Sequence, residues 1–212
     1  MKQSFMRAVC FAELPDKLLR SFLLSFALAA CSINTSLTNE ASFWEAPYPS
    51  LPLSYLPSLE VPDEPLTAPY KLSVALQKIE DQRQEKAIFE YQGKVVREQG
   101  DMGLPVHYVL QTGLEDRGFV VSDSAPVSIH VAVTSWRAQL IDGKLAAEAV
   151  LIGNVLSPGG KTIYSGVYEG ASTAAESDIT PAAVQEVLGS AMHRALTKIV
   201  SDKKFIDVLS SF

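Results

Sequence analysis

Apolar residues recur at every second position in several segments of the C-terminal two thirds of the chain. This period of two predicts half-buried β-strands, because successive side chains of a strand point to opposite faces. In the last such segment Tyr164 and Tyr168 share one face, and Ile163 and Val167 share the other. The predicted strands cover residues 70–77, 87–96 (turning at Gly93), 119–121, 127–133, 145–155 and 161–169.

Two segments instead carry the helical period of 3.6 residues. Residues 104–117 place Pro105 in a first turn, and Gly118 follows as a C-terminal cap. A longer helix opens at Thr180, whose side chain caps it, with Pro181 next. A short helix at residues 205–209 follows it.

Turn signals fix how these elements connect. Asp142-Gly143 predicts a tight hairpin, and residues 157–160 (Ser-Pro-Gly-Gly) predict a second turn. The small residues of 170–179 predict a loop. The order predicts an α+β domain. Its sheet is mostly antiparallel, made of the first strand plus a C-terminal three-stranded meander, with the two main helices packed on one face.

The first 31 residues have the pattern of an export signal. Residues 21–30 (SFLLSFALAA) are apolar and follow Lys17 and Arg20, and this core is too short to span a bilayer. The end of the core, Leu-Ala-Ala-Cys at residues 28–31, resembles the lipobox of bacterial lipoprotein precursors. That resemblance implies cleavage before Cys31, a diacylglycerol on its sulfur and a further acyl chain, such as palmitate, on its amine. Ser32 implies sorting to the outer membrane.

A proline-rich segment separates Cys31 from the domain. Seven prolines lie between residues 47 and 69, which disfavours helices and central strands. The chain therefore divides into a signal peptide (1–30), a lipidated cysteine with its tether (31–69) and one domain (70–212). Fully extended, the tether reaches ~120 Å. Its apolar residues are either incidental or pack on the domain or a partner; they are Trp44, Tyr48, Leu51, Tyr55 and Leu56.

Composition narrows the function classes. The chain has 212 residues, 47% of them apolar, and a net charge of -6, which excludes a basic nucleic-acid-binding face. Its two cysteines, Cys10 and Cys31, exclude a disulfide scaffold and a multi-cysteine zinc site. His107, His130 and His193 form no metal motif, so we expect neither a metal nor another cofactor.

An ordered set of short motifs follows the lipobox. Asp81-Gln82-Arg83 ends the first strand, and Arg117-Gly118-Phe119 leaves the first helix ahead of the meander. This order resembles the YajG family of uncharacterised bacterial lipoproteins over most of residues 70–209. The resemblance matches the Asp-x-Arg of that family to Asp81 and Arg83, and it implies no established enzymatic activity. The layout is also similar to transport-auxiliary and lipopolysaccharide-assembly lipoproteins.

Two groups of residues are candidates for binding. Asp81 and Arg83 form either a corner that binds a polar ligand or a capping salt bridge at a strand exit. Trp136, Tyr164 and Tyr168 form either an aromatic platform for a glycan or peptide, or ordinary sheet packing. No nucleophile elbow, P-loop or dinucleotide fingerprint occurs in the sequence, so we expect no catalytic residues.

The sequence therefore predicts a lipoprotein anchored through Cys31 to the periplasmic side of the outer membrane. We expect a non-enzymatic binding or envelope-assembly module whose partner is an envelope protein or a glycan, and not nucleic acid. The alternatives are an auxiliary subunit of a transport or lipopolysaccharide-handling complex and, third, an envelope hydrolase with a site assembled by the fold.

Overall fold

A computed structural model describes residues 40–46, 49–52, 72–174 and 179–212 of the chain. The signal peptide, Cys31 and most of the proline-rich segment, including Tyr48, Tyr55 and Leu56, lie outside the described residues. Contacts divide the chain into two units, Met1–Phe43 and a compact unit over Trp44–Phe212. The compact unit thus begins well before residue 70, where the sequence places the start of the domain.

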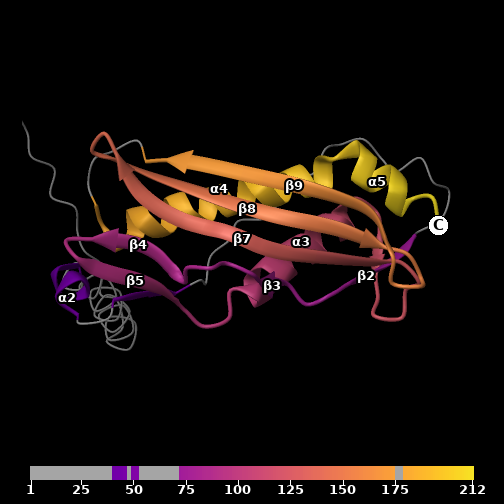
Figure 1. Cartoon of the computed structure of the whole chain (residues 1–212), viewed down its shortest axis with the longest axis horizontal. Coiled ribbons are helices and arrows are strands. Elements are labelled where there is room, and N and C mark those ends of the chain that lie inside the picture. The colour runs from indigo at the N-terminus through magenta and orange to yellow at the C-terminus, as the bar shows by residue number, and fades with distance from the viewer. Residues whose placement is uncertain (1–39, 47–48, 53–71, 175–178) are drawn as a thin grey trace, which may run out of the picture. The chain divides into compact units, whose positions relative to one another are not determined.

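Three long strands form the centre of the compact unit (Figure 1). They are β7 (Ser128–Ile141), β8 (Lys144–Leu156) and β9 (Thr162–Thr173), each antiparallel to the next. Asp142 and Gly143 join β7 to β8 with positive φ angles of 51° and 75°, which is the backbone that a two-residue hairpin needs. The predicted meander is therefore confirmed.

A β-bulge divides β7 into two halves. The register against β8 shifts between Val133 and Ser135, so one extra residue enters the strand there. Before the bulge the odd-numbered residues, such as Val131, are buried, and after it the even-numbered Trp136 and Ala138 are buried. The extra residue is what keeps the apolar side chains of both halves on the helix-covered face.

The sheet is mixed, which corrects the prediction of a mostly antiparallel sheet that includes the first strand. β2 (Ser73–Leu76) lies between β6 (Val120–Val121) and β7 and is parallel to both. The charged segment predicted as the exit of that strand is itself a strand, β3 (Glu80–Asp81), which also pairs with β7 in parallel. The chain passes through a hairpin and α3 before returning to the sheet, and this allows parallel pairing.

A small second sheet has the order β1-β5-β4. β4 (Ala87–Tyr91) and β5 (Lys94–Gln99) form the hairpin that the sequence predicts at Gly93. β1 (Ser50–Pro52) comes from the proline-rich segment and pairs in parallel with β5 at the edge of this sheet. An edge is where a strand that contains proline is tolerated, because proline offers no N–H to a second neighbour.

Trp44, in the short helix α2 (Glu40–Glu45), fastens this N-terminal segment to the β4–β5 hairpin. Its ring makes edge contacts with Phe89 and Tyr91 at centroid distances of 6.1 and 5.1 Å. Lys94 Nζ donates hydrogen bonds to the carbonyl oxygens of Trp44 and Ala46. Of the predicted alternatives for the apolar residues of the tether, packing on the domain holds for Trp44 and for Leu51, which is 3% exposed.

Helix α4 (Pro181–Ser201) packs across β7, β8 and β9, and α3 (Gly103–Asp116) packs against α4 and β6 (Figure 1). The predicted caps are confirmed: Thr180 Oγ1 accepts from the Ala183 N–H at 3.1 Å, and Gly118 has a φ of 95°. The short helix α5 (Lys203–Leu209) is capped by the carboxylate of Asp202.

The prediction of a loop from residue 170 is wrong for its first part, because β9 continues to Thr173. The small residues there have a packing role. A Cβ on Gly170 would lie 1.9 Å from the carbonyl oxygen of Ala191 and 2.7 Å from the Ala195 nitrogen, so α4 touches the strand backbone directly. Lys198 Nζ and an Nη of Arg194 then donate to the carbonyl oxygens of Glu169 and Ala171. These bonds occupy acceptors on the outer edge of β9.

Gly170→Ala is therefore expected to destabilise the fold strongly, because backbone atoms on α4 and β9 would have to separate. We expect a loss of about 3 kcal/mol or more in the free energy of unfolding. Gly159→Ala is the matched control, since its Cβ would meet nothing within 4 Å. Urea unfolding of both variants measures the difference, and equal stability would contradict the close helix–strand packing.

Candidate functional site

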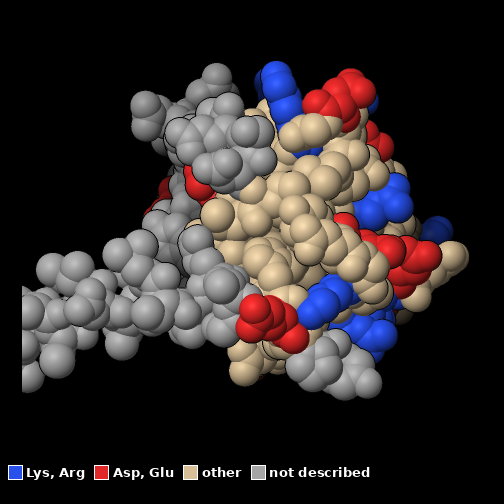
Figure 2. All heavy atoms as spheres, turned by 90° about the vertical axis from the view of Figure 1, so that its left-hand side faces the viewer, with Lys and Arg blue, Asp and Glu red and all other residues tan. Residues whose placement is uncertain are grey.

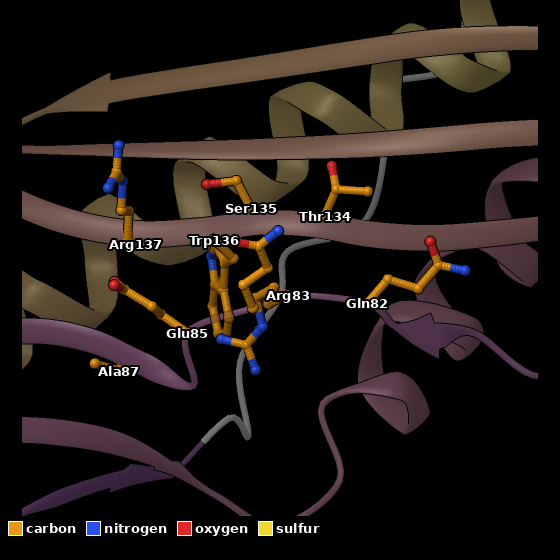
Figure 3. A pocket seen from close by; sticks show the side chains of 9 residues that line it. Gln82, Arg83, Glu85, Ala87, Thr134, Ser135, Trp136 and Arg137 are labelled. Atoms are coloured by element: carbon orange, nitrogen blue, oxygen red, sulfur yellow. The ribbon is translucent and has the colours of Figure 1, made fainter.

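A pocket of about 480 Å³ opens beside the bulge of β7 (Figure 3). β3 stops pairing with β7 at Val133, and the chain then turns away toward β4. This departure leaves a hollow between the β3–β4 connection and the second half of β7. We call it the bulge pocket, and it is lined by Gln82, Arg83, Gln84, Glu85, Ala87, Thr134, Ser135, Trp136 and Arg137.

Arg83 is the most firmly held of these residues. It is 5% exposed, and its Nε and Nη2 bind the two carboxylate oxygens of Asp81 at 2.9 and 3.0 Å. Nη2 also donates to Glu98 Oε1 on β5, so one guanidinium joins the large sheet to the small one. Lys86 Nζ lies 2.6 Å from Asp81 Oδ2 on the solvent side. The sequence predicts either a binding corner or a salt bridge for Asp81 and Arg83. The structure contains the salt bridge, and Arg83 also lines the pocket.

Trp136 forms the buried wall of the bulge pocket. The guanidinium of Arg83 lies 5.7 Å from the centroid of its ring, a cation–π distance. Figure 3 shows the two side chains next to each other. Its indole Nε1 donates to the carbonyl oxygen of Leu188 on α4 at 3.0 Å. The ring is 5% exposed, so it supports Arg83 and does not offer an open stacking surface.

Two polar atoms of this cluster are buried without a hydrogen-bond partner among the described residues. They are Arg83 Nη1, a donor, and Glu98 Oε2, an acceptor. An unmet hydrogen bond on a buried charged group costs a few kcal/mol, about 1–3. The positive charges of Arg83 and Lys86 balance the negative charges of Asp81 and Glu98. Within the described residues, however, Arg83 Nη1 lacks an acceptor and Glu98 Oε2 lacks a donor.

The ion pairs shift the ionisation of their members. The hydrogen bond from Arg83 holds the pKa of Asp81 well below its usual range, against the opposing effect of burial. Burial lowers the pKa of Arg83, but its bonds to Asp81 and Glu98 outweigh that effect, so its pKa is raised. Hydrogen bonds from Gln82 and then His130 lower the pKa of Glu80. The Asp81–Arg83 pair is thus charged throughout the physiological range.

The structure does not bring Tyr164 and Tyr168 to Trp136. Both phenol groups donate to Asp202 Oδ2, at 2.6 and 2.9 Å, and both rings make edge contacts with Phe205. Burial and then the hydrogen bond to Asp202 raise the pKa of Tyr168. Of the two predicted alternatives, packing on the sheet holds for Tyr164 and Tyr168, and their contacts with Asp202 and Phe205 hold α5 in place. Trp136 belongs to the bulge pocket.

Most residues of the bulge pocket were not singled out from the sequence. Glu98 lies 15 residues from Arg83, and nothing local signals that they meet. A pattern does mark the segment that holds Thr134, Ser135 and Arg137. Apart from Ala132, the buried apolar residues of β7 are odd-numbered up to Val133 and even-numbered from Trp136 onward. That change marks a bulge, and bulges often lie beside functional sites.

Other candidate chemistry is sparse in the described part of the chain. His130 Nε2 lies 3.2 Å from Glu80 Oε1 on the sheet face away from α4. Within the described ranges, no three residues among His, Cys, Asp and Glu are grouped so that they could hold a metal ion. None of the described helices is both long and apolar enough to cross a membrane.

The described residues form an α+β domain with a mixed sheet and a pocket beside the bulge of β7. Residues 70–210 match a family described as uncharacterized lipoprotein, and this chain belongs to that family. The prediction of an uncharacterised bacterial lipoprotein is confirmed at this level. Among curated proteins, none matches the sequence.

Several solved structures are similar to this chain at low sequence identity. A protein from Xanthomonas campestris has a TM-score of 0.58 and 14% identity, over 74% of this chain and 98% of its own. A minor lipoprotein from Acinetobacter baumannii has a TM-score of 0.40 and 10% identity, over 66% and 93%. A lipoprotein from Neisseria meningitidis has a TM-score of 0.37 and 9% identity, over 50% and 87%. At these identities the first similarity shows the fold alone.

Asp81→Asn tests the contribution of the buried ion pair through its pH dependence. We expect the variant to lose about 2–3 kcal/mol of unfolding free energy at pH 7. The reason is that the buried charge of Arg83 would then be paired with the Glu98 carboxylate but no longer with that of Asp81. The folded pKa of Asp81 lies below the unfolded value of 3.8. Its stabilisation is therefore complete above that value and is lost as the pH falls below it.

The stability gap between wild type and Asp81→Asn should accordingly shrink from pH 6 to pH 3. Urea unfolding at both pH values measures it, with Asp116→Asn on the exposed end of α3 as control. A gap that stays constant over this range would contradict the depressed pKa.

Proposed function

We propose that this lipoprotein is a non-enzymatic binding module of the cell envelope, and that it binds through the bulge pocket. The observation that carries the proposal is the construction of this pocket. A buried arginine, fixed by two carboxylates and a tryptophan, lines a pocket rimmed by exposed polar side chains. Pockets of roughly 300–1,000 Å³ with a few fixed polar groups are the usual size and type of ligand site.

The groups that line the pocket support binding more than catalysis. The Ser135 hydroxyl donates to Glu148 Oε1 at 3.2 Å, and the Thr134 hydroxyl donates to the Val150 carbonyl oxygen at 3.2 Å. A nucleophile needs a base with a pKa near neutral within hydrogen-bond reach. The lining contains no histidine, and its one fully buried ionic residue, Arg83, is permanently charged.

The proposed attachment is a lipid on Cys31, placing the domain on the periplasmic side of the outer membrane. Trp44 and β1 fasten the N-terminal segment to the β4–β5 hairpin, so only 12 residues separate Cys31 from Trp44. At ~3.5 Å per residue, they allow a reach of about 45 Å, well under half that of a free 38-residue tether. The bulge pocket would then operate close to the membrane.

An auxiliary-subunit role is the alternative, and exposed apolar residues favour it. Val167 is 63% exposed on the sheet face opposite α4, beside Ile152 on the neighbouring strand. Leu140 and Ile141 are also exposed, at the end of the β7–β8 hairpin. Figure 2 shows that uncharged side chains fill the middle of that end of the domain, with charged ones around them. Such surfaces suit a protein partner.

Replacing Cys31 tests the attachment. Wild-type protein should fractionate with the outer membrane and have an intact mass that shows removal of residues 1–30 and acylation. Cys31→Ala should be released or remain unprocessed, because the thioether cannot form. A soluble wild-type protein that keeps residues 1–30 would exclude the anchor.

Site-specific photocrosslinking in living cells tests the pocket against the alternative. A photoreactive residue at Gln84, on the pocket rim, should give an adduct with an envelope component, and one at Val167 should not. An adduct of protein size at Val167 alone would favour the auxiliary subunit. Labelling that is absent at Gln84, or equal at Lys161 in the exposed β8–β9 turn, would rule out the bulge pocket as the binding site.

A further inference from the structure

β9 is an edge strand of the large sheet, because β8 pairs with one side of it and no strand among the described residues pairs with the other (Figure 1). The direction of its backbone groups follows from a hydrogen bond at its end. The Ala174 N–H donates to the carbonyl oxygen of Leu145, so the even-numbered residues of β9 turn their backbone groups toward β8. The odd-numbered residues turn theirs outward, and Ile163, at the bulge of β9, has no register partner on β8.

Helix α4 protects only part of this edge. Two of its cations donate to the outward carbonyl oxygens of Glu169 and Ala171. In the part of the chain that the structure describes, no hydrogen bond reaches the outward backbone groups of Ile163, Ser165 or Val167, and all three residues are exposed. Residues 162–168 also contain no charge and no proline, which are the residues that commonly keep an edge from pairing with another strand. We call residues 163–167 the open edge.

The open edge is complementary to a second copy of itself that runs antiparallel to it. With Ser165 opposite Ser165 of the second copy, Ile163 of each copy lies opposite Val167 of the other. The same register brings Lys161 toward Glu169, and these two exposed residues have opposite charges. Each outward N–H of one copy then meets an outward C=O of the other, and both kinds of side-chain pair are favourable across neighbouring strands.

Hydrogen bonds already present in the chain select this register. A pair centred one residue earlier would use Lys161, whose carbonyl oxygen already accepts from the Ser157 N–H. A pair centred one residue later would use Glu169, whose carbonyl oxygen already accepts from Lys198 Nζ. The pair centred on Ser165 joins the residues of the open edge to one another and uses no backbone group that is already bonded.

We propose that β9 pairs with β9 of a second copy of this chain about a two-fold axis at Ser165, so that the two large sheets become one. The contact is isologous, as in most homodimers. It is shorter than a standard interface, which buries about 1,200–2,000 Å², so we expect a Kd of roughly 100 µM or tighter and no permanent dimer. The inference does not depend on what the bulge pocket binds, because β8 separates that pocket from β9.

Single cysteines test the register in the full-length protein, solubilised in detergent and treated with copper phenanthroline. Ser165→Cys should form a disulfide-linked dimer, because residues in a hydrogen-bonded antiparallel pair have Cα atoms about 5.5 Å apart, within disulfide reach. Glu169→Cys is the matched control. Residue 169 is also exposed, but its equivalent in the second copy would lie eight residues along the strand, about 26 Å away. Wild-type protein, with Cys10 and Cys31, gives the background.

Charge reversal tests the same contact in solution, by sedimentation equilibrium of the full-length protein in a density-matched detergent. Lys161→Glu should weaken dimerisation at least about tenfold, because each dimer contains two of these charge pairs. Lys161→Glu/Glu169→Lys should restore the wild-type Kd, although the two residues are about 26 Å apart within one strand. Lys144→Glu, in the exposed β7–β8 turn, should leave the Kd unchanged.

Three results would overturn the pairing: wild-type protein that stays monomeric at several times the expected Kd, equal disulfide yields at residues 165 and 169, or a double charge variant as weak as the single one. Ser165→Cys protein that crosslinks to a different protein in membranes would show that the open edge receives another partner, and would overturn it as well. In the photocrosslinking experiment above, adducts between two copies have twice the mass of the chain, which distinguishes them from adducts with another envelope component. A monomeric protein that still crosslinks at Gln84 would leave the proposed function in place.

Discussion

The extra residue in β7 is the constraint on which the rest of this domain depends. On one side of the bulge, β7 pairs with β2 and β3 and buries its odd-numbered residues; on the other, it buries Trp136 and Ala138 against α4. An unbroken strand would turn Trp136 to the opposite face, because a shift of one residue exchanges the two faces. The hydrogen bond from Trp136 to Leu188 would then be lost, and Arg83 would have no ring beneath it.

A second consequence of the bulge is that the edge of β7 has different neighbours along its two halves. β3 protects the first half of β7, and the small sheet approaches the second half without pairing to it in the described residues. Arg83 spans this change by binding Asp81 on β3 and Glu98 on β5. One buried cation therefore holds the two sheets in place and lines the pocket between them, which couples the stability of the fold to the geometry of the site.

Local chemistry made much of this fold predictable. The turns at Gly93 and at Asp142–Gly143, the Thr180 cap and Gly118 each determine the adjacent backbone, and the structure has them as expected. The parallel pairing of β2 was not predictable, because it depends on a long crossover and not on the strand's own residues. Gly170 shows the limit most clearly: small residues suggest a loop, and only contact with Ala191 reveals that they are small so that a helix can approach.

The candidate site, like the fold, could be predicted only in part from the sequence. Asp81 and Arg83 are two residues apart, and the sequence offers their salt bridge as one of two alternatives. Glu98 and Trp136 join them only through tertiary contacts. Isolated pairs of carboxylate and arginine are common, and alone they say little of function. What distinguishes this pair is that the fold buries it, supports it on an aromatic ring and leaves one N–H and one oxygen unmet. Because such atoms are costly to bury, the fold keeps this cluster at a cost in stability.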